Sequence, residues 1–264
     1  TVARIDVSQF NKVVDICGKH VYPGLILPNT TLGLVDVNAV RATRDFAEVG
    51  GVNPNVRALI AYNTDSELIA TLRYNGILLA QATPTGGIVS GTSSIMKLDG
   101  WNWEDAAYKA DDGVHLNWPA KRLRARWWLG ENEGRDNPGY GKTIAAIDQV
   151  FKDAKSYASM DNPATKNIKL EAMRGLIEGT STLFIHVSNR AEIIESVQWA
   201  KKAEVAKIVL VDAEEAHLAA DFLKENNIPV LLAEVHRLPS RTDDDIDMPY
   251  RLPGILHNKG VLVG

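Results

Sequence analysis

Two side chains that can transfer protons stand at the ends of apolar runs in the second half of the chain. His186 lies in the run Thr-Leu-Phe-Ile-His-Val at residues 182–187, and Asp212 directly follows the run Lys-Ile-Val-Leu-Val at 207–211. Continuous short runs of this kind are typical of strands buried on both faces. In parallel α/β folds the carboxyl ends of the strands carry the functional site. Asp212 is therefore a candidate general base, and His186 a candidate ligand-binding residue.

Both residues also have an ordinary structural interpretation. Asp212 can cap a helix that begins near Glu214, because Asp is a preferred N-cap residue. His186 can be a buried histidine that is hydrogen-bonded to a neighbouring carbonyl group. The sequence leaves these alternatives open.

Further polar or glycine-rich segments fall at comparable positions. His236 and Arg237 follow a third apolar run at 228–232, where they would contact a carboxylate-bearing ligand or lie in a solvated loop. The glycine- and serine-rich segments 86–87 and 90–94 suit a turn between a strand and a helix, with an anion-binding loop as the alternative.

The elements that position these residues alternate between strands and helices. Strands are expected at 182–187, 207–211, 228–232 and 261–263. Helices are expected after the N-cap Asn189 and at 214–225 and 249–258. This repetition implies parallel strand pairing with right-handed crossovers, and it fits both a barrel and an open doubly wound sheet.

The first half of the chain is less regular. Strands are expected at 21–27, 77–82 and 114–116. Helices are expected at 65–73, 101–109 and 141–157. The charged, tryptophan-rich segment 121–137 is expected to be an excursion from the fold.

Composition excludes several classes of partner. The 264 residues are enough for one large domain, and the net charge of -4 gives no electrostatic reason to expect nucleic acid or an anionic membrane. The single cysteine, Cys17, cannot form an intrachain disulfide, and no segment resembles a membrane span or a signal peptide. We therefore expect a cytoplasmic protein with a small-molecule ligand and no nucleic-acid or membrane partner. Homo-oligomerisation is left open.

A motif near the start of the chain is similar to a known family. Residues 18–26, Gly-Lys-His-Val-Tyr-Pro-Gly-Leu-Ile, resemble the start of the first barrel strand of the amidohydrolase superfamily, closest to its imidazolonepropionase-like branch. The resemblance continues weakly through 86–94 and clearly from 183 to 263. It implies a (β/α)8 TIM-type barrel with a small β-sandwich built from both chain ends. It also implies hydrolysis of non-peptide C–N bonds in small or cyclic amides.

Most of the metal ligands that this resemblance implies are replaced. Asn29 and Thr31 stand where the family has the two histidines of the first strand. The resemblance aligns His186 with the histidine ligand of the fifth strand, Asp212 with that of the sixth, and Asn117 with a bridging carboxylate. Amide and hydroxyl groups are poor zinc ligands compared with imidazole and carboxylate. We therefore expect no bound metal and no other cofactor.

The resemblance also predicts how the chain is divided. Residues 1–20 are expected to be a remnant of the β-sandwich, with strands within 3–16, and residues 21–264 to be the amidohydrolase-like barrel. The barrel is expected to be incomplete at its C-terminus, because the last family elements would fall beyond Gly264.

Together these observations predict an amidohydrolase-like protein that lacks a metal and is either impaired in hydrolysis or repurposed. The alternative is a non-catalytic subunit that binds a small molecule or serves in assembly, which Asn29 and Thr31 favour over metal-dependent hydrolysis. Asp212 is the predicted catalytic residue, and the predicted substrate-binding residues are Asn29, Thr31, Asn117, His186 and His236.

Overall fold

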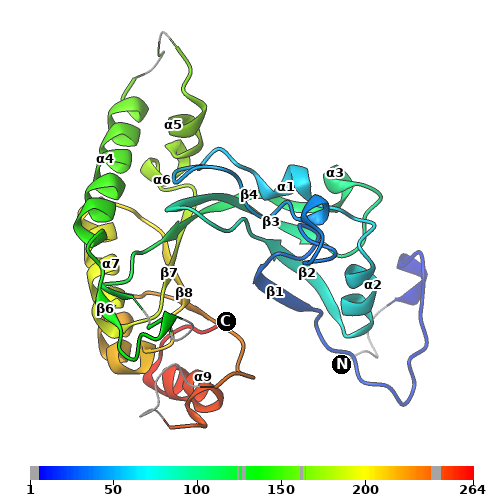
Figure 1. Cartoon of the computed structure of the whole chain (residues 1–264). Helices are drawn as coiled ribbons and strands as arrows, with labels where there is room; N and C mark the ends of the chain where they lie inside the picture. The colour runs from blue at the N-terminus through cyan, green and yellow to red at the C-terminus, as the bar shows by residue number, and fades with distance from the viewer. Residues whose placement is uncertain (1–5, 124, 127–128, 161–162, 164, 239–244) are drawn as a thin grey trace.

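One mixed sheet runs through the whole fold. The computed structural model describes residues 6–123, 125–126, 129–160, 163, 165–238 and 245–264. Seven strands pair in the order β1-β2-β3-β4-β7-β8-β9, and the sheet curves into a nearly closed barrel (Figure 1). The expected α/β barrel class is confirmed, although β3 runs antiparallel to both of its neighbours.

The strands differ in length between the two halves of the sheet. The sheet consists of β1 (Leu25–Thr30), β2 (Ile77–Ala82), β3 (Val89–Lys97), β4 (Ala107–Asn117), β7 (Thr182–Val187), β8 (Ile208–Asp212) and β9 (Val230–Leu232). A separate hairpin, β5 (Arg122–Leu123) and β6 (Arg135–Asp136), lies in the expected excursion, of which residues 124, 127 and 128 are outside the described part.

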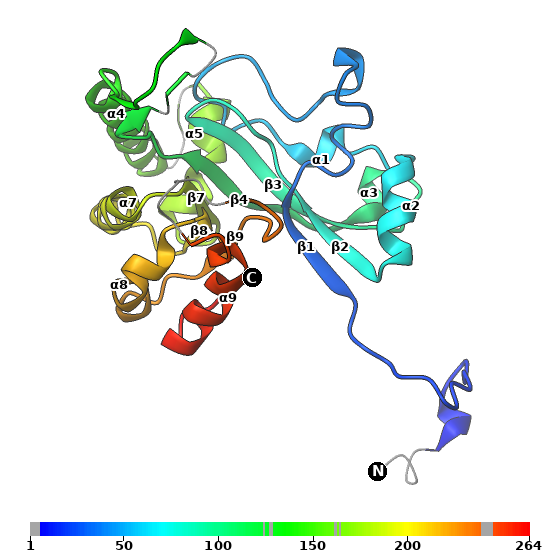
Figure 2. The same ribbon diagram turned by 60° about the horizontal axis from the view of Figure 1, so that its bottom comes forward.

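Helices cover the outer side of both halves (Figure 2). They are α1 (Ala58–Ala61), α2 (Glu67–Tyr74), α3 (Trp103–Ala106), α4 (Tyr140–Ala158), α5 (Ile168–Ala172), α6 (Arg174–Ile177), α7 (Arg190–Lys202), α8 (Ala220–Glu225) and α9 (Met248–Lys259). Within the described residues, no helix has the length and apolar character needed to cross a membrane.

The second half has the expected parallel strands. β7 spans the predicted residues, β8 pairs parallel with it, and β9 pairs parallel with β8. The expected strand at 261–263 contributes one parallel bridge, between Val230 and Val263. These short strands carry alternating or continuous apolar residues and are joined by amphipathic helices, so the sequence pattern determines them directly.

The first half differs from the sequence prediction in several places. β1 spans Leu25–Thr30 instead of 21–27, and β4 spans Ala107–Asn117 instead of 114–116. The segment 90–94 is not a turn but lies inside β3, where Gly91 approaches the backbone of Val56 too closely for a side chain. The helix expected at 101–109 ends at Ala106, because the residues that follow pair with β3 as the start of β4. Small polar residues resemble a turn locally, and only pairing with neighbouring strands makes them a strand.

The N-terminal segment lies away from the barrel in both views (Figures 1 and 2). Its described part contains the 3-10 turn Val7–Gln9 and has no strand between residues 6 and 24. Residues 3–5 of the expected sandwich strands lie outside the described residues. The division of the chain at residue 20 stays a prediction.

Two apolar clusters flank the sheet. The larger one joins the outward residues of β4, β7 and β8 to α4, α7 and α9, and the smaller one joins β2 and β3 to α1. In β4, Val114 and Leu116 point into the larger cluster, so the alternate residue His115 must face the opposite side of the sheet. This alternation turns His115 and Asn117 toward the interior of the barrel.

The larger cluster predicts the stability effect of a core truncation. Leu210 in β8 is fully buried, so Leu210→Ala should lower the free energy of unfolding in urea by about 2–5 kcal/mol. Leu218 is 54% exposed, and Leu218→Ala should change it by less than about 0.5 kcal/mol. Equal losses in the two variants would contradict the position of Leu210 in the core.

Candidate functional site

Two histidines from neighbouring parallel strands meet inside the barrel. Nδ1 of His115 in β4 lies 2.9 Å from Nε2 of His186 in β7. His115 is completely buried and stacks on the ring of Phe184, with ring centroids 4.7 Å apart. Phe184 is the residue paired with His115 in the β4–β7 register, so strand pairing alone sets this stack.

A glycine makes room for this stack. A Cβ atom at Gly113 would lie 2.6 Å from the Phe184 ring and 2.4 Å from the carbonyl oxygen of Thr182. Any larger residue at Gly113 would push the ring away from His115 or separate the two strands. The sequence Gly113-Val114-His115 therefore fits this position of the sheet.

Asp212 lies next to the histidine pair. Its Oδ2 is 3.7 Å from Nδ1 of His186, and its side chain is 38% exposed compared with 17% for His186. Asp212 has a φ of 71°, a left-handed conformation that Asp tolerates better than most residues. It does not cap the following helical turn, whose N-cap is Glu215, so this alternative interpretation is wrong.

One hydrogen bond joins the two histidines, and Asp212 lies within ion-pair distance of His186. In the tautomer that carries the proton of His186 on Nδ1, toward Asp212, Nε2 of His186 accepts from Nδ1–H of His115. This arrangement leaves only an acceptor, Nε2 of His115, without a partner among the described residues. Burial, followed by the effect of the neighbouring His186, holds the pKa of His115 well below its usual value of 6.5. His115 is therefore neutral, and Asp212 is the member that solvent reaches.

Asn117 closes one side of the site. It pairs with His186 in the strand register, but its Nδ2 donates to the carbonyl oxygen of Gly87 and to Oγ of Ser90, both at 2.9 Å. The amide therefore fixes the loop before β3. The Nδ2 group of Asn117 therefore donates its hydrogen bonds to other residues of the protein.

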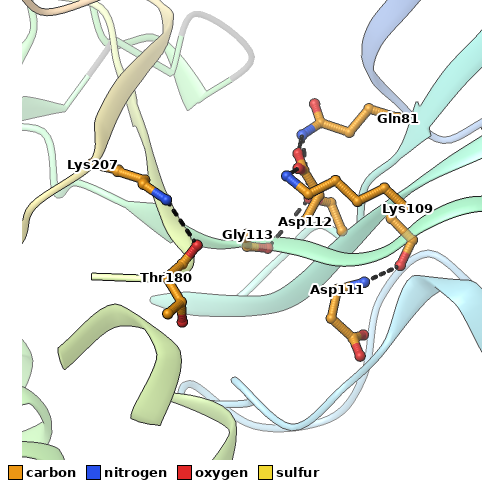
Figure 3. Close-up of polar contacts among 9 residues, drawn as sticks. Gln81, Lys109, Asp111, Asp112, Gly113, Thr180 and Lys207 are labelled. Atoms are coloured by element: carbon orange, nitrogen blue, oxygen red, sulfur yellow. Dashed lines mark hydrogen bonds and ion pairs between the residues drawn. The ribbon is translucent and has the colours of Figure 1, made fainter. Parts of the chain in front are cut away.

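A second polar network joins Gln81 to Asp112 and Lys109 in β4 (Figure 3). Gln81 in β2 accepts from the backbone N–H of Asn29 at 3.1 Å, and its Nε2 donates to Asp112 at 3.0 Å. Lys109 forms an ion pair with the other carboxylate oxygen of Asp112. Gln81 and Asp112 are both buried, so these contacts satisfy polar groups that water does not reach.

A local irregularity in β4 turns Asp112 toward Gln81. The preceding Asp111 has a φ of 52°, and its carboxylate binds Arg57 through two hydrogen bonds of 2.8 Å. The register of β3 and β4 shifts at the same level. An irregularity of this type redirects side chains, so consecutive aspartates serve different partners.

The predicted site residues are only partly brought together. His186 and Asp212 lie side by side, and Asn117 is level with His186. Asn29 is bound to Gln81 through its backbone, and His236 lies 3.3 Å from the hydroxyl of Tyr250. In the part of the chain that the structure describes, no polar contact joins Asn29, Thr31 or His236 to the histidine pair.

Sequence reasoning missed His115, Gln81 and Asp112. His115 stands two residues before Asn117, and residues two apart on a strand face the same way. This spacing could have placed His115 on the same face as the predicted site residue Asn117. Gln81 had a similar signal, because it is the only polar side chain in the expected strand 77–82. Asp112 had none, since its direction depends on the irregularity at Asp111.

The donors present do not fit a zinc site. Zinc catalysis needs about three protein ligands and an open position for water. Nε2 of His186 is turned to His115, and the amide of Asn117 is engaged by Gly87 and Ser90. Among the described residues, no three His, Cys, Asp or Glu side chains form a group suited to a metal ion.

One solved structure is similar to this chain over nearly its whole length. It is the crystal structure of an amidohydrolase from Thermotoga maritima MSB8, with a TM-score of 0.79 and 19% sequence identity, covering 96% of this chain and 69% of that one. No protein-family model matches the sequence, and no curated protein matches it. The likeness shows the fold alone, so the chemistry has to be argued from the residues.

The buried histidine predicts a dependence of stability on pH. Because the pKa of His115 is lowered in the folded state, the unfolded chain binds the extra proton below pH 6.5 and stability falls as the pH drops. The slope from this residue approaches about 1.4 kcal/mol per pH unit. The free energy of unfolding in urea should decrease between pH 7.5 and pH 5.5. The decrease should be smaller for His115→Asn than for the parent protein, because Asn does not titrate. Equal losses would show that His115 is protonated in the folded protein.

The ligand set predicts the metal content. Protein purified without chelators should contain no stoichiometric transition metal, because Nε2 of His186 is turned to His115 and the amide of Asn117 donates to Gly87 and Ser90. Elemental analysis tests this directly, and one zinc per chain would overturn it.

Proposed function

We propose that this chain is an amidohydrolase-like protein of the imidazolonepropionase-like branch that acts on a small or cyclic amide without a transition metal. The proposal rests on the pair of His186 and Asp212 at adjacent strand ends, in a fold similar to that of an amidohydrolase. The carboxyl ends of barrel strands are the usual place for catalytic groups in this architecture.

The chemistry we propose is general-base hydrolysis of a non-peptide C–N bond. Asp212 accepts a proton from water, and the oxygen attacks the carbonyl carbon. The proton then passes from Asp212 to the leaving nitrogen as the C–N bond breaks. His186 orients the carboxylate, and His115 fixes His186 from behind.

The same geometry explains why such an enzyme would be slow. Attack on a carbonyl group develops negative charge on its oxygen, and stabilising that charge is usually the largest catalytic contribution. The neutral His115 carries no charge to supply, and both nitrogens of His186 face other side chains. We therefore expect impaired hydrolysis compared with metal-dependent relatives.

A non-catalytic role is the second candidate. The polar groups around the site are committed to one another, as in Asn117 with Ser90 and His115 with His186. A satisfied network of this kind is rigid, and a rigid site loses little entropy when a small ligand binds. In this case the chain is a small-molecule-binding or assembly subunit.

The base is tested by Asp212→Asn in an assay of hydrolysis on a panel of cyclic amides. Asn also tolerates the positive φ at this position, so the backbone is kept while the base is lost. The rate should fall by about 10²–10⁴-fold. Asp221→Asn, an exposed aspartate of α8 paired with Lys259, should retain the parent rate.

Two results would count against this assignment. An Asp212→Asn variant that hydrolyses at the parent rate would show that Asp212 is not the base. A parent protein that binds panel amides, detected as a rise in its melting temperature, but does not hydrolyse them would establish the binding role instead.

A further inference from the structure

A cavity outside the strand-end site opens between α4 and α7. It has a volume of about 290 Å³ and lies on the outer side of the barrel, where both figures draw the two helices next to each other. Its lining residues are Asp148, Phe151, Lys152, Lys155, Trp199, Lys202 and Ala203. The spacing of three and four residues along each helix places them on one face.

The floor of this cavity is aromatic and rigid. The ring of Trp199 contacts Phe151 edge to face, with centroids 4.8 Å apart, and Trp118 at 5.4 Å. Asp148 accepts from the indole Nε1–H of Trp199 at 2.6 Å, which fixes the orientation of the ring. Trp199 is only partly buried, so an indole held in one position faces the cavity.

The rim of the cavity is basic. Lys155 forms an ion pair with Glu204 across the gap between the two helices. Lys152 and Lys202 are exposed, and neither has a hydrogen bond or an ion pair with another described residue. The lining therefore has three lysines and one carboxylate, Asp148, which accepts from the indole of Trp199. Lys152 and Lys202 stand beside the apolar floor without an ion pair of their own.

We propose that this cavity binds a small organic anion, a carboxylate attached to an aromatic or aliphatic body. The apolar body would lie on Trp199 and Phe151, and the carboxylate would face Lys152 and Lys202. Ligand sites of this size combine a mostly apolar lining with a few polar groups that set orientation. The two lysines would repel a cation, so charge complementarity selects the anion over a cationic aromatic ligand. The proposal is independent of the function assigned to Asp212.

The test uses 2-naphthoate and its neutral counterpart, 2-naphthylmethanol. Each is titrated into the ¹⁵N-labelled full chain, and the indole N–H signal of Trp199, assigned with Trp199→Phe, is followed by NMR. 2-Naphthoate should shift this signal in a saturable way. The neutral alcohol should bind about tenfold more weakly, because it lacks the charge.

The exposed lysines provide variants that leave the fold intact. The double variant Lys152→Gln with Lys202→Gln should weaken 2-naphthoate binding about tenfold and leave the affinity for 2-naphthylmethanol unchanged. The matched control is Lys142→Gln with Lys166→Gln, which removes the same charge from exposed positions outside the cavity. It should retain the parent affinity.

Three results would overturn the proposal. One is a Trp199 signal that 2-naphthoate does not move. Another is equal affinity for the acid and the alcohol, which would make the cavity a general apolar site. The third is an equal loss of affinity in both double variants, which would reduce the effect to the net charge of the protein.

Discussion

The pairing of β4 with two unlike neighbours is the constraint on which the rest of the structure depends. Strand β4 pairs antiparallel with β3 on one side and parallel with β7 on the other. β4 therefore connects the irregular first half of the sheet to the regular parallel second half. Val114 and Leu116 on its outer face join the larger apolar cluster, and this directs His115, which lies between them, toward the barrel interior.

The polar contacts inside the barrel depend on this position of β4 between the two halves. Asp112 reaches back to Gln81 in the first half, whereas His115 reaches forward to His186 in the second. Burying these groups is unfavourable unless each finds a partner, so a shift of β4 by one residue would break both networks and expose its apolar face. The two networks therefore stabilise one register of the whole sheet.

The sequence predicts the second half of the fold better than the first for a physical reason. In β7 and β8 the apolar runs are continuous and the connections are amphipathic helices, so local patterns carry the structure. β3 has small residues such as Gly91 and Ser93, whose preference is weak and whose conformation depends on both neighbouring strands. The site divides in the same way. Asp212 and His186 follow from strand ends, whereas Asp112 depends on a local irregularity that no local pattern predicts.

A hydrogen bond from inside the barrel holds the end of β1. Asn29 has a φ of 45° at the end of β1, and Gln81 accepts its backbone N–H from inside the barrel. Gln81 is fixed in turn by Asp112, which Lys109 neutralises. Since an amide side chain can accept and donate at once, Gln81 connects β1 to β4 without any charged group of its own. These contacts therefore help to position the end of β1 relative to β4.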